Sequence, residues 1–218
     1  MARFHDRTDA GRTLARALAA YAGQPDVRIL ALPRGGVPVA FEVARALRAP
    51  LDVFVVRKLG VPGHEEYAMG AIASGGHAVI SEDVVRRLGI SADALERVAE
   101  RERRELERRE RRYRGDRPPP EMSGRTVVIV DDGLATGATA RTALAAARAR
   151  NPAYLMFAAP VCAAQSTVGL RPYADAVACA LAPMDLYAVG QWYVDFTQLS
   201  DEEVVRLLAE ARAAATTR

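Results

Sequence analysis

Long apolar runs are missing from this chain of 218 residues. The longest, such as the run at 126–130, have the length of a strand, whereas a membrane-spanning helix needs about 20 apolar residues. The first dozen residues are charged and lack the apolar segment of a secretory signal. The length suits one domain. We therefore expect a single domain in the cytoplasm with no membrane partner.

Cysteine and histidine are scarce, which argues against a zinc centre. The two cysteines, Cys162 and Cys179, match no zinc or redox spacing, and both lie in apolar segments. We expect them to be buried free thiols. His5, His64 and His77 are scattered, without the i, i+4 pair of a helical metal site.

The net charge of +3 is concentrated in one segment, residues 97–117, with ten arginines against six acidic residues. Its charges alternate in sign, and three Glu-to-Arg pairs have i, i+4 spacing. These pairs are Glu100 with Arg104, Glu105 with Arg109, and Glu107 with Arg111. The pattern predicts a solvated helix; the alternative is a nucleic-acid-binding arm, which would need a surplus of unpaired arginines. We expect no nucleic-acid partner.

Short β-rich runs alternate with helical patterns along the chain, which predicts an α/β fold with a largely parallel sheet flanked by helices. The runs are apolar at nearly every position, as in strands buried on both faces. The expected strands are 27–32, 52–56, 126–130, 153–159 and 176–181. The expected helices are 8–22, 37–48, 82–88, 92–114, 138–150, 163–171 and 200–214. Ser91 and the pair Ser200 and Glu203 supply helix start signals, and the breaker-rich segment 115–124 predicts an internal loop.

The strongest functional signal is VVIVDDGLATGAT, from Val127 to Thr139. A buried strand ends in Asp131 and Asp132, and a turn of small residues then opens a helix. Such a turn lets several backbone N–H groups approach one anion, and the helix start adds its positive dipole end. The chain contains neither GxxxxGK[ST] nor a GxGxxG after a strand, which argues against a nucleoside-triphosphate or dinucleotide loop. Carboxylates beside a phosphate should face hydroxyls or a metal, and a ribose phosphate satisfies both demands.

This segment closely resembles the signature with which type I phosphoribosyltransferases bind phosphoribosyl pyrophosphate (PRPP). The resemblance implies that Asp131 and Asp132 contact the ribose hydroxyls, and that the turn wraps the 5′-phosphate. The residues of that turn are Ala135, Thr136, Gly137, Ala138 and Thr139. Gly133 departs from the family pattern, which usually has an aliphatic residue there. The family uses Mg²⁺, which Asp131, Asp132 and Asp195 would hold mostly indirectly.

A second anion loop is needed for the pyrophosphate, and Arg34, Gly35 and Gly36 follow the first predicted strand. They resemble the family's pyrophosphate loop, although an ordinary strand-to-helix turn is the alternative. RKLGVPG, at 57–63, resembles the flexible catalytic loop of adenine phosphoribosyltransferases and predicts a mobile lid. Within and after it we expect catalytic roles for Arg57, Glu66 and Lys58, the single lysine of the chain.

The acceptor pocket is predicted near the C-terminus, where Tyr187 and Trp192 offer aromatic faces for a planar base. The alternative is a hydrophobic patch that pins the last helix. The segment distantly resembles the one that closes over the base in hypoxanthine-guanine phosphoribosyltransferases. Ala135, however, replaces the aspartate general base of those enzymes. The loops are therefore more similar to those of adenine phosphoribosyltransferases. In that family a glutamate of the lid serves near the base, and the resemblance implies this role for Glu65 or Glu66.

The resemblance implies one phosphoribosyltransferase domain over 1–218, with a small hood over the carboxyl ends of the strands. We expect the charged helix and connector, about 92–124, to be an internal insertion, and 183–215 to form the hood and last helix. The implied reaction transfers phosphoribose from PRPP to a nitrogenous base, purine-like by preference, in a homodimer. The rival is a regulator that binds PRPP or a nucleotide without transfer.

Overall fold

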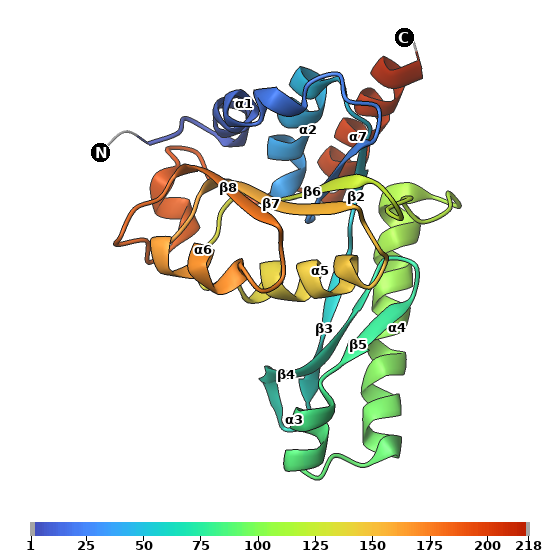
Figure 1. Cartoon of the computed structure of the whole chain (residues 1–218). Coiled ribbons are helices and arrows are strands. Elements are labelled where there is room, and N and C mark those ends of the chain that lie inside the picture. The colour runs from blue at the N-terminus through green and yellow to red at the C-terminus, as the bar shows by residue number, and fades with distance from the viewer. Residues whose placement is uncertain (1–2, 217–218) are drawn as a thin grey trace.

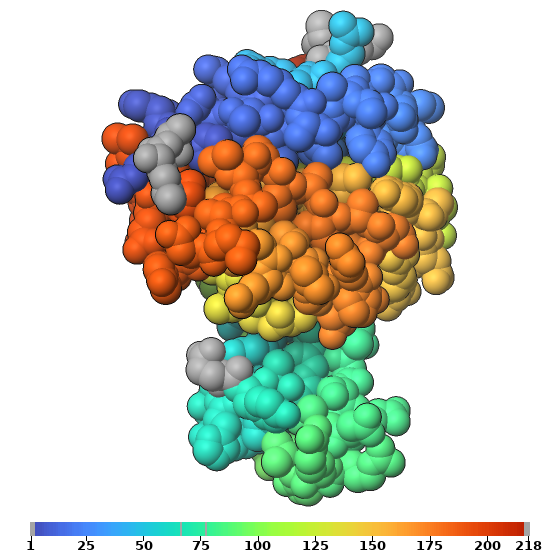
Figure 2. Space-filling model, turned by 60° about the vertical axis from the view of Figure 1, so that its left-hand side comes forward, coloured from blue at the N-terminus to red at the C-terminus, as the bar shows by residue number. Residues whose placement is uncertain are grey.

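The computed structural model describes residues 3–216, apart from the side chains of Glu66, His77 and Thr216. A main body contains a five-stranded sheet, and a narrower lobe extends from it (Figure 1, Figure 2). The expected α/β class is confirmed. Within residues 3–216, no helix combines the length and apolar character needed to span a bilayer.

All five strands of the central sheet are parallel, in the order β2-β1-β6-β7-β8. Their bounds are β1 Val27–Ala31, β2 Leu51–Val53, β6 Thr126–Val130, β7 Tyr154–Val161 and β8 Ala176–Leu181. Each predicted run overlaps its strand. The run at 52–56 ends early as β2 because the chain leaves this sheet at Phe54 and enters a second one at Val56.

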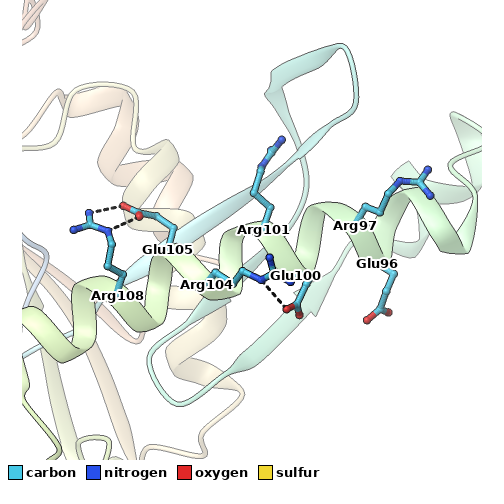
Figure 3. Close-up of a pocket in the computed structure, with 7 residues that line it drawn as sticks. All are labelled: Glu96, Arg97, Glu100, Arg101, Arg104, Glu105 and Arg108. Carbon is cyan, nitrogen blue, oxygen red and sulfur yellow. Dashed lines mark hydrogen bonds and ion pairs between the residues drawn. The ribbon is translucent and has the colours of Figure 1, made fainter.

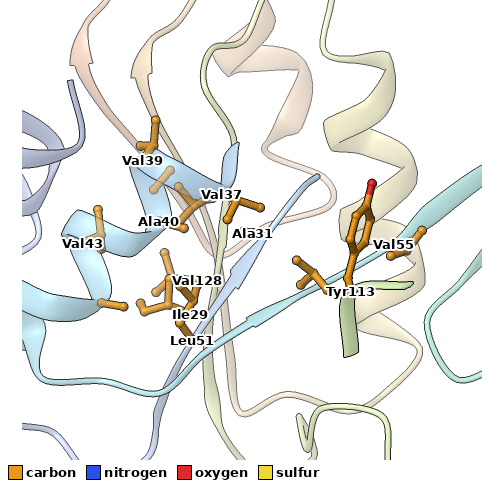
Figure 4. Close-up of a cluster of buried hydrophobic side chains, with 14 of the residues drawn as sticks. Ile29, Ala31, Val37, Val39, Ala40, Val43, Leu51, Val55, Tyr113 and Val128 are labelled. Carbon is orange, nitrogen blue, oxygen red and sulfur yellow. The ribbon is translucent and has the colours of Figure 1, made fainter. Parts of the chain in front are cut away.

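The sheet is buried on both faces, as its apolar runs predict. Val128 and Val130 of β6 join one core cluster, while Val127 and Ile129 join the other. The first cluster lies under α2 and includes Ile29 (Figure 4). Small side chains of α5 pack in the second. The sheet is therefore a rigid platform, and its loops are free to carry function.

All seven predicted helices are present. Their bounds are α1 Arg7–Ala17, α2 Gly36–Leu47, α3 Glu82–Arg87, α4 Ala92–Arg114, α5 Ala138–Arg148, α6 Ala164–Leu170 and α7 Asp201–Thr216, with short 3₁₀ turns η1 Ala19–Tyr21 and η2 Val189–Trp192. The side chain of Ser91 accepts from Ala94 N, which confirms the first start signal. Ser200 and Glu203 cap each other's backbone N–H groups, which confirms the capping box.

The projecting lobe contains a three-stranded antiparallel sheet where the sequence predicts a mobile lid. Its strands are β3 Val56–Val61, β4 His64–Ala73 and β5 His77–Ile80, and α3 and α4 pack beside them (Figure 1). The prediction of a flexible loop in this segment is wrong. Its glycines allow neighbouring strands to pack closely. A Cβ on Gly60 would lie 2.5 Å from Glu65 O, and one on Gly70 would lie 2.6 Å from Val79 O.

The N-terminal strap, residues 3–6, lies along the C-terminal segment. Phe4 N donates to Trp192 O at 2.9 Å, and Val194 N donates to Phe4 O at 2.9 Å. Residues 183–200 therefore form the predicted hood together with the strap, which the sequence did not indicate. The predicted C-terminal helix does not join the hood: α7 packs against α2 and α4.

The predicted free thiols are wrong, because Cys162 and Cys179 form a disulfide. Cys162 directly follows β7, and Cys179 lies on the neighbouring strand β8, opposite Ala159. Strand pairing brings the two Cα atoms to 6.1 Å, within the range that a disulfide bridges. The pairing depends on which strands are neighbours, so the spacing in the sequence could not reveal it.

Candidate active site

Both predicted anion loops lie at the switch point of the central sheet. β1 and β6 are neighbours, and the chain proceeds from β1 outward to β2 but from β6 outward to β7 and β8. Ligands of open α/β sheets bind beyond the carboxyl ends of the strands at such a point. Here β1 leads into the first loop, residues 32–36, and β6 leads into the phosphate loop, residues 131–139.

Glycine lets the two loops touch. A Cβ on Gly35 would lie 2.0 Å from Asp132 Oδ2, and one on Gly36 would lie 2.5 Å from Val130 O. Leu32 N also donates to Val130 O at 2.8 Å. Any side chain at either glycine would push the first loop away from the acid pair. The structure thus brings the predicted pyrophosphate and ribose residues together.

The phosphate loop is braced from outside through its carbonyl groups. Ser166 Oγ donates to Ala135 O, and Arg141 Nη1 donates to Thr136 O at 3.0 Å. Gly137 has φ 76°, a left-handed conformation that favours glycine, and α5 begins at the next residue. Thr136 and Thr139 are both exposed. A turn with braced carbonyls, exposed hydroxyls and a helix start suits an anion.

The acid pair is held in a partly buried position. Burial raises the pKa of Asp131 well above its ordinary value, and the adjacent charge of Asp132 raises it further. Burial also raises the pKa of Asp132, while the guanidinium of Arg7 opposes the shift. Tyr193 donates its hydroxyl to Asp132 O at 2.6 Å, and burial raises the pKa of Tyr193 as well. Two adjacent carboxylates at this edge suit ligand hydroxyls or a cation.

Arg34 of the first loop is half-exposed and lies near the start of α7. Its Nη1 is 3.9 Å from Asp201 Oδ1, and Asp201 accepts a hydrogen bond from Tyr113 of α4 at 2.7 Å. Burial, followed by that hydrogen bond, raises the pKa of Tyr113 to about 12. The contact between Arg34 and Asp201 is long, so an anion on the first loop could draw the guanidinium toward itself.

The hood packs directly on the phosphate loop. A Cβ on Gly133 would lie 2.4 Å from Val189 Cγ1 of η2, which explains why glycine replaces the aliphatic residue usual at this position. Beside η2, a pocket of about 460 Å³ is lined by Arg3, Asp185, Tyr187, Gln191 and Trp192. The two predicted acceptor residues, Tyr187 and Trp192, therefore share a pocket, and the side chain of Tyr187 is 84% exposed.

Asp195, the third predicted metal residue, is engaged in its own turn. Its Oδ1 accepts from Thr197 N at 2.9 Å and from Thr197 Oγ1 at 2.6 Å. These hydrogen bonds lower the pKa of Asp195. Among residues 3–216 with described side chains, no group of three or more His, Cys, Asp or Glu residues could hold a metal ion. Asp131 and Asp132 lie at the loops themselves; Asp131 Oδ1 accepts a hydrogen bond from Asp132 N at 2.9 Å.

The predicted catalytic residues of the lid lie in the projecting lobe. Arg57 is paired with Glu102 of α4, with Nη2 and Oε2 2.6 Å apart. Lys58 lies on β3 opposite Ala71 of β4, within the antiparallel sheet of the lobe. The side chain of Glu66, on β4, lies outside the described residues. The structure therefore places these residues on a different sheet from the one that carries the phosphate loop.

A hollow of about 750 Å³ also runs along the exposed face of α4 (Figure 3). Two ion pairs of the lining lie within the helix: Arg104 Nε is 3.1 Å from Glu100 Oε1, and Arg108 Nε is 2.8 Å from Glu105 Oε2. The predicted pair of Glu105 with Arg109 is also present, at 2.8 Å. That of Glu107 with Arg111 is absent from the described ion pairs. These pairs at i, i+3 and i, i+4 are typical of a solvated helix with interleaved charges.

Sequence reasoning missed Arg7, which contacts the acid pair from the start of α1. Its Nε donates to Asp132 Oδ2 at 2.9 Å, although the two residues are 125 positions apart. The strap places Arg7 there by pairing with the hood. No local pattern around Arg7 indicates this contact. The segment RTDAGR can be recognised as the start of a helix, but it does not reveal the partner of Arg7.

A parallel sheet with two glycine-containing loops at its switch point is the architecture of a phosphate-binding α/β protein. The sequence matches the model of the phosphoribosyl transferase domain family over residues 3–190. The chain therefore belongs to this family.

Comparison with individual proteins agrees with this assignment. A provisionally named phosphoribosyl transferase of Mycobacterium tuberculosis is 50% identical over 208 residues, which cover 95% of this chain and 47% of the relative. The chain thus spans about half the length of the curated relatives it matches. The crystal structure of TT1426 from Thermus thermophilus has a TM-score of 0.86 at 43% identity and covers 95% of this chain and 98% of its own. A Neisseria gonorrhoeae protein with bound ppGpp shares the fold, with a TM-score of 0.52, 15% identity and 97% of each chain covered.

Proposed function

We propose that this protein is a phosphoribosyltransferase that transfers 5-phosphoribose from PRPP to a nitrogenous base, purine-like by preference, and releases pyrophosphate. One observation carries the proposal: the first loop and the phosphate loop meet at one switch point, with Gly35 pressed against Asp132. PRPP has phosphate groups at both ends of one ribose, so it requires two anion sites with hydroxyl acceptors between them. The family assignment supports the same ligand.

The bond that breaks joins ribose C1 to the pyrophosphate, and the new bond joins C1 to a nitrogen of the base, with inversion. Positive charge develops on C1 and negative charge on the leaving group. Ala135 to Thr139 would hold the 5′-phosphate, while Asp131 and Asp132 would hold the ribose hydroxyls and favour the cationic centre. Arg34, Gly35 and Gly36 would bind the departing pyrophosphate.

Mg²⁺ fits the residues present. It keeps several waters and is commonly bound through one or two carboxylates plus substrate phosphates, without an all-protein cage. Asp131 and Asp132 provide two carboxylates at the correct edge, which suits a metal carried in with PRPP. When bound, Mg²⁺ would neutralise charge on the pyrophosphate. Asp195, which is occupied by its own turn, is the weaker candidate for an indirect contact.

The acceptor base would stack in the pocket of Tyr187 and Trp192. Lys58 and Glu66 remain proposed contributors, to pyrophosphate departure and base binding respectively. The pairing of Arg57 with Glu102 supports a structural role for Arg57 in place of the proposed catalytic one. The homodimer and the cytoplasmic location stay predictions; a disulfide is rarer in cytosolic proteins than in exported ones.

The alternative, a regulator that binds PRPP without transfer, is favoured by one observation: Arg57 and Lys58 lie in the projecting lobe. Pyrophosphate release separates the two functions. The protein would be incubated with PRPP, Mg²⁺ and a panel of purine and pyrimidine bases, beside Asp132→Asn and the surface control Asp83→Asn. We expect base-dependent release by wild type and the control, and strongly reduced release by Asp132→Asn. Saturable PRPP binding without release would establish the regulator; no binding would refute both functions.

A further inference from the structure

Arg7 is held at the ribose acids from three sides. Its Nε donates to Asp132 Oδ2 at 2.9 Å, and its Nη1 donates to Thr197 O at 3.0 Å. The face of the guanidinium lies over Phe196, with Cζ 3.9 Å from the ring centroid. The side chains of Arg7 and Asp132 are only 11% and 16% exposed. A planar cation with both edges and a face engaged is a fixed part of the site, unlike an exposed ion pair.

The carboxylate oxygen that Arg7 binds also lies against the first loop. Asp132 Oδ2 is the atom that a Cβ on Gly35 would approach to 2.0 Å, while Tyr193 holds the carbonyl group of the same aspartate. Arg7 therefore fixes Oδ2 in the narrow space between the two anion loops. Among the hydrogen bonds of residues 3–216, none is accepted by Asp132 Oδ1, so Oδ1 is the oxygen that we assign to a ligand hydroxyl.

The hood keeps Arg7 in this place. α1 begins at Arg7, with Asp6 as its N-cap, and the strap before it is paired with the hood through Phe4 and His5. Phe196 and Thr197, which contact the guanidinium, belong to the same hood segment. The strap and the C-terminal segment of the hood thus both position the guanidinium of Arg7, which binds Asp132.

We propose that Arg7 is a positioning residue of the ribose site, which holds Asp132 so that its free oxygen accepts a hydrogen bond from a ribose hydroxyl. The inference rests on the proposed function, because it takes Asp132 to be a ribose ligand. Since Arg7 acts on the ribose acid, its loss should weaken ligands that contain ribose and spare those that lack it.

Binding of two probes tests this selectivity. Calorimetric titrations with ribose 5-phosphate and with inorganic phosphate, both without Mg²⁺, would compare wild type, Arg7→Ala, Arg7→Lys and the control Arg12→Ala. Arg12 lies on the same helix, is 58% exposed and pairs with Glu42, away from the loops. For Arg7→Ala we expect ribose 5-phosphate affinity to fall about tenfold or more, as for loss of a charged hydrogen bond, with phosphate affinity unchanged. Arg7→Lys should be intermediate because it keeps the charge but lacks the fork, and Arg12→Ala should behave as wild type.

Two results would overturn the role of Arg7: unchanged ribose 5-phosphate affinity, or an equal loss for both probes, which would indicate a general structural effect. If Arg7→Ala does not fold, Arg7→Gln, which keeps most of the side-chain packing, is judged by the same criteria. The wild-type titration with PRPP is made first. A wild type that does not bind PRPP refutes the proposed function, whereas a wild type that binds and an Arg7→Ala that binds equally well refutes only the inference.

Discussion

Arg7 at the sheet edge and Arg57 in the projecting lobe are each paired with a poorly exposed carboxylate, at 2.9 Å and 2.6 Å. The partner of Arg7 is Asp132, which faces the space between two anion loops. The partner of Arg57 is Glu102, which fastens α4 to β3 inside the lobe. If Asp132 is the ribose ligand that we propose, similar ion pairs serve a ligand site in one region and the assembly of a substructure in the other. The surrounding backbone, more than the ion pair itself, indicates the role: two loops meet at the pair of Arg7, whereas a helix and a strand meet at the pair of Arg57.

Gly35→Ala should produce the largest effect on PRPP binding, and only at the sheet edge. The new Cβ would overlap Asp132 Oδ2 at 2.0 Å, so the loops must separate. We expect PRPP affinity to fall by about a hundredfold, the equivalent of about 2.7 kcal/mol, near the upper range for a charged hydrogen bond. The control is Gly169→Ala, where no atom lies within 4 Å of the added Cβ. Equal affinities of the two variants in PRPP titrations would contradict the packing of the loops.

Loss of the disulfide should destabilise the body beside the phosphate loop. Cys162 and Cys179 close a loop with a sequence separation of 17, which by chain entropy corresponds to about 3 kcal/mol. Leu134 of the phosphate loop pairs with Cys162, so PRPP binding should weaken too. Urea unfolding of the Cys162→Ser and Cys179→Ser double variant, beside wild type with and without reductant, measures the change. If reductant and the double substitution leave the midpoint unchanged, the disulfide does not contribute.

Arg57→Ala should destabilise the lobe and spare the ligand site. Removing the guanidinium leaves Glu102, with a side chain 9% exposed, to Arg101 alone. We expect a loss of about 2 kcal/mol in the free energy of unfolding, less than the full cost of breaking a buried pair. The matched control is Arg86→Ala, whose pair with Asp83 is exposed and should be worth less than about 1 kcal/mol.

PRPP titration and a turnover assay of Arg57→Ala then decide between a structural and a catalytic role for Arg57. Wild-type affinity with lowered stability supports a structural Arg57. Wild-type stability with lowered turnover would restore its predicted catalytic role and remove the contrast with Arg7.

Tyr193→Phe should have the smallest effect. It removes one hydrogen bond to the backbone carbonyl of Asp132 and keeps the ring that packs between Phe4 and Phe196. We expect the free energy of PRPP binding to weaken by about 1 kcal/mol, which is a several-fold rise in the Kd. Tyr173→Phe, at an exposed ring outside the proposed site, is the control for this titration. A loss as large as that of Gly35→Ala would mean that the hydroxyl does more than support the acid pair.

The sequence predicted the central sheet well because its strands are apolar runs, and Ser91 and Ser200 correctly indicated the starts of α4 and α7. It also predicted where the two glycine-containing loops lie, because the residues of each loop are contiguous. It failed for β3 and β4. In the sequence, Gly60 and Gly70 suggest a flexible loop, because the close contact with a neighbouring strand that requires glycine is visible only in the folded chain. It missed Arg7 and the disulfide for a related reason: each joins segments that only the folded chain brings together.

The sequence by itself determined the α/β class, the order of the central strands and of the helices, and the two glycine-containing loops, since all of these depend on local patterns of apolar, small and acidic residues. Only the tertiary structure decided that β1 and β6 are neighbours, that the lid residues build a separate lobe, and that the strap brings Arg7 to Asp132. Neighbouring strands and long-range ion pairs depend on how elements pack against one another, and that packing is a property of the whole chain.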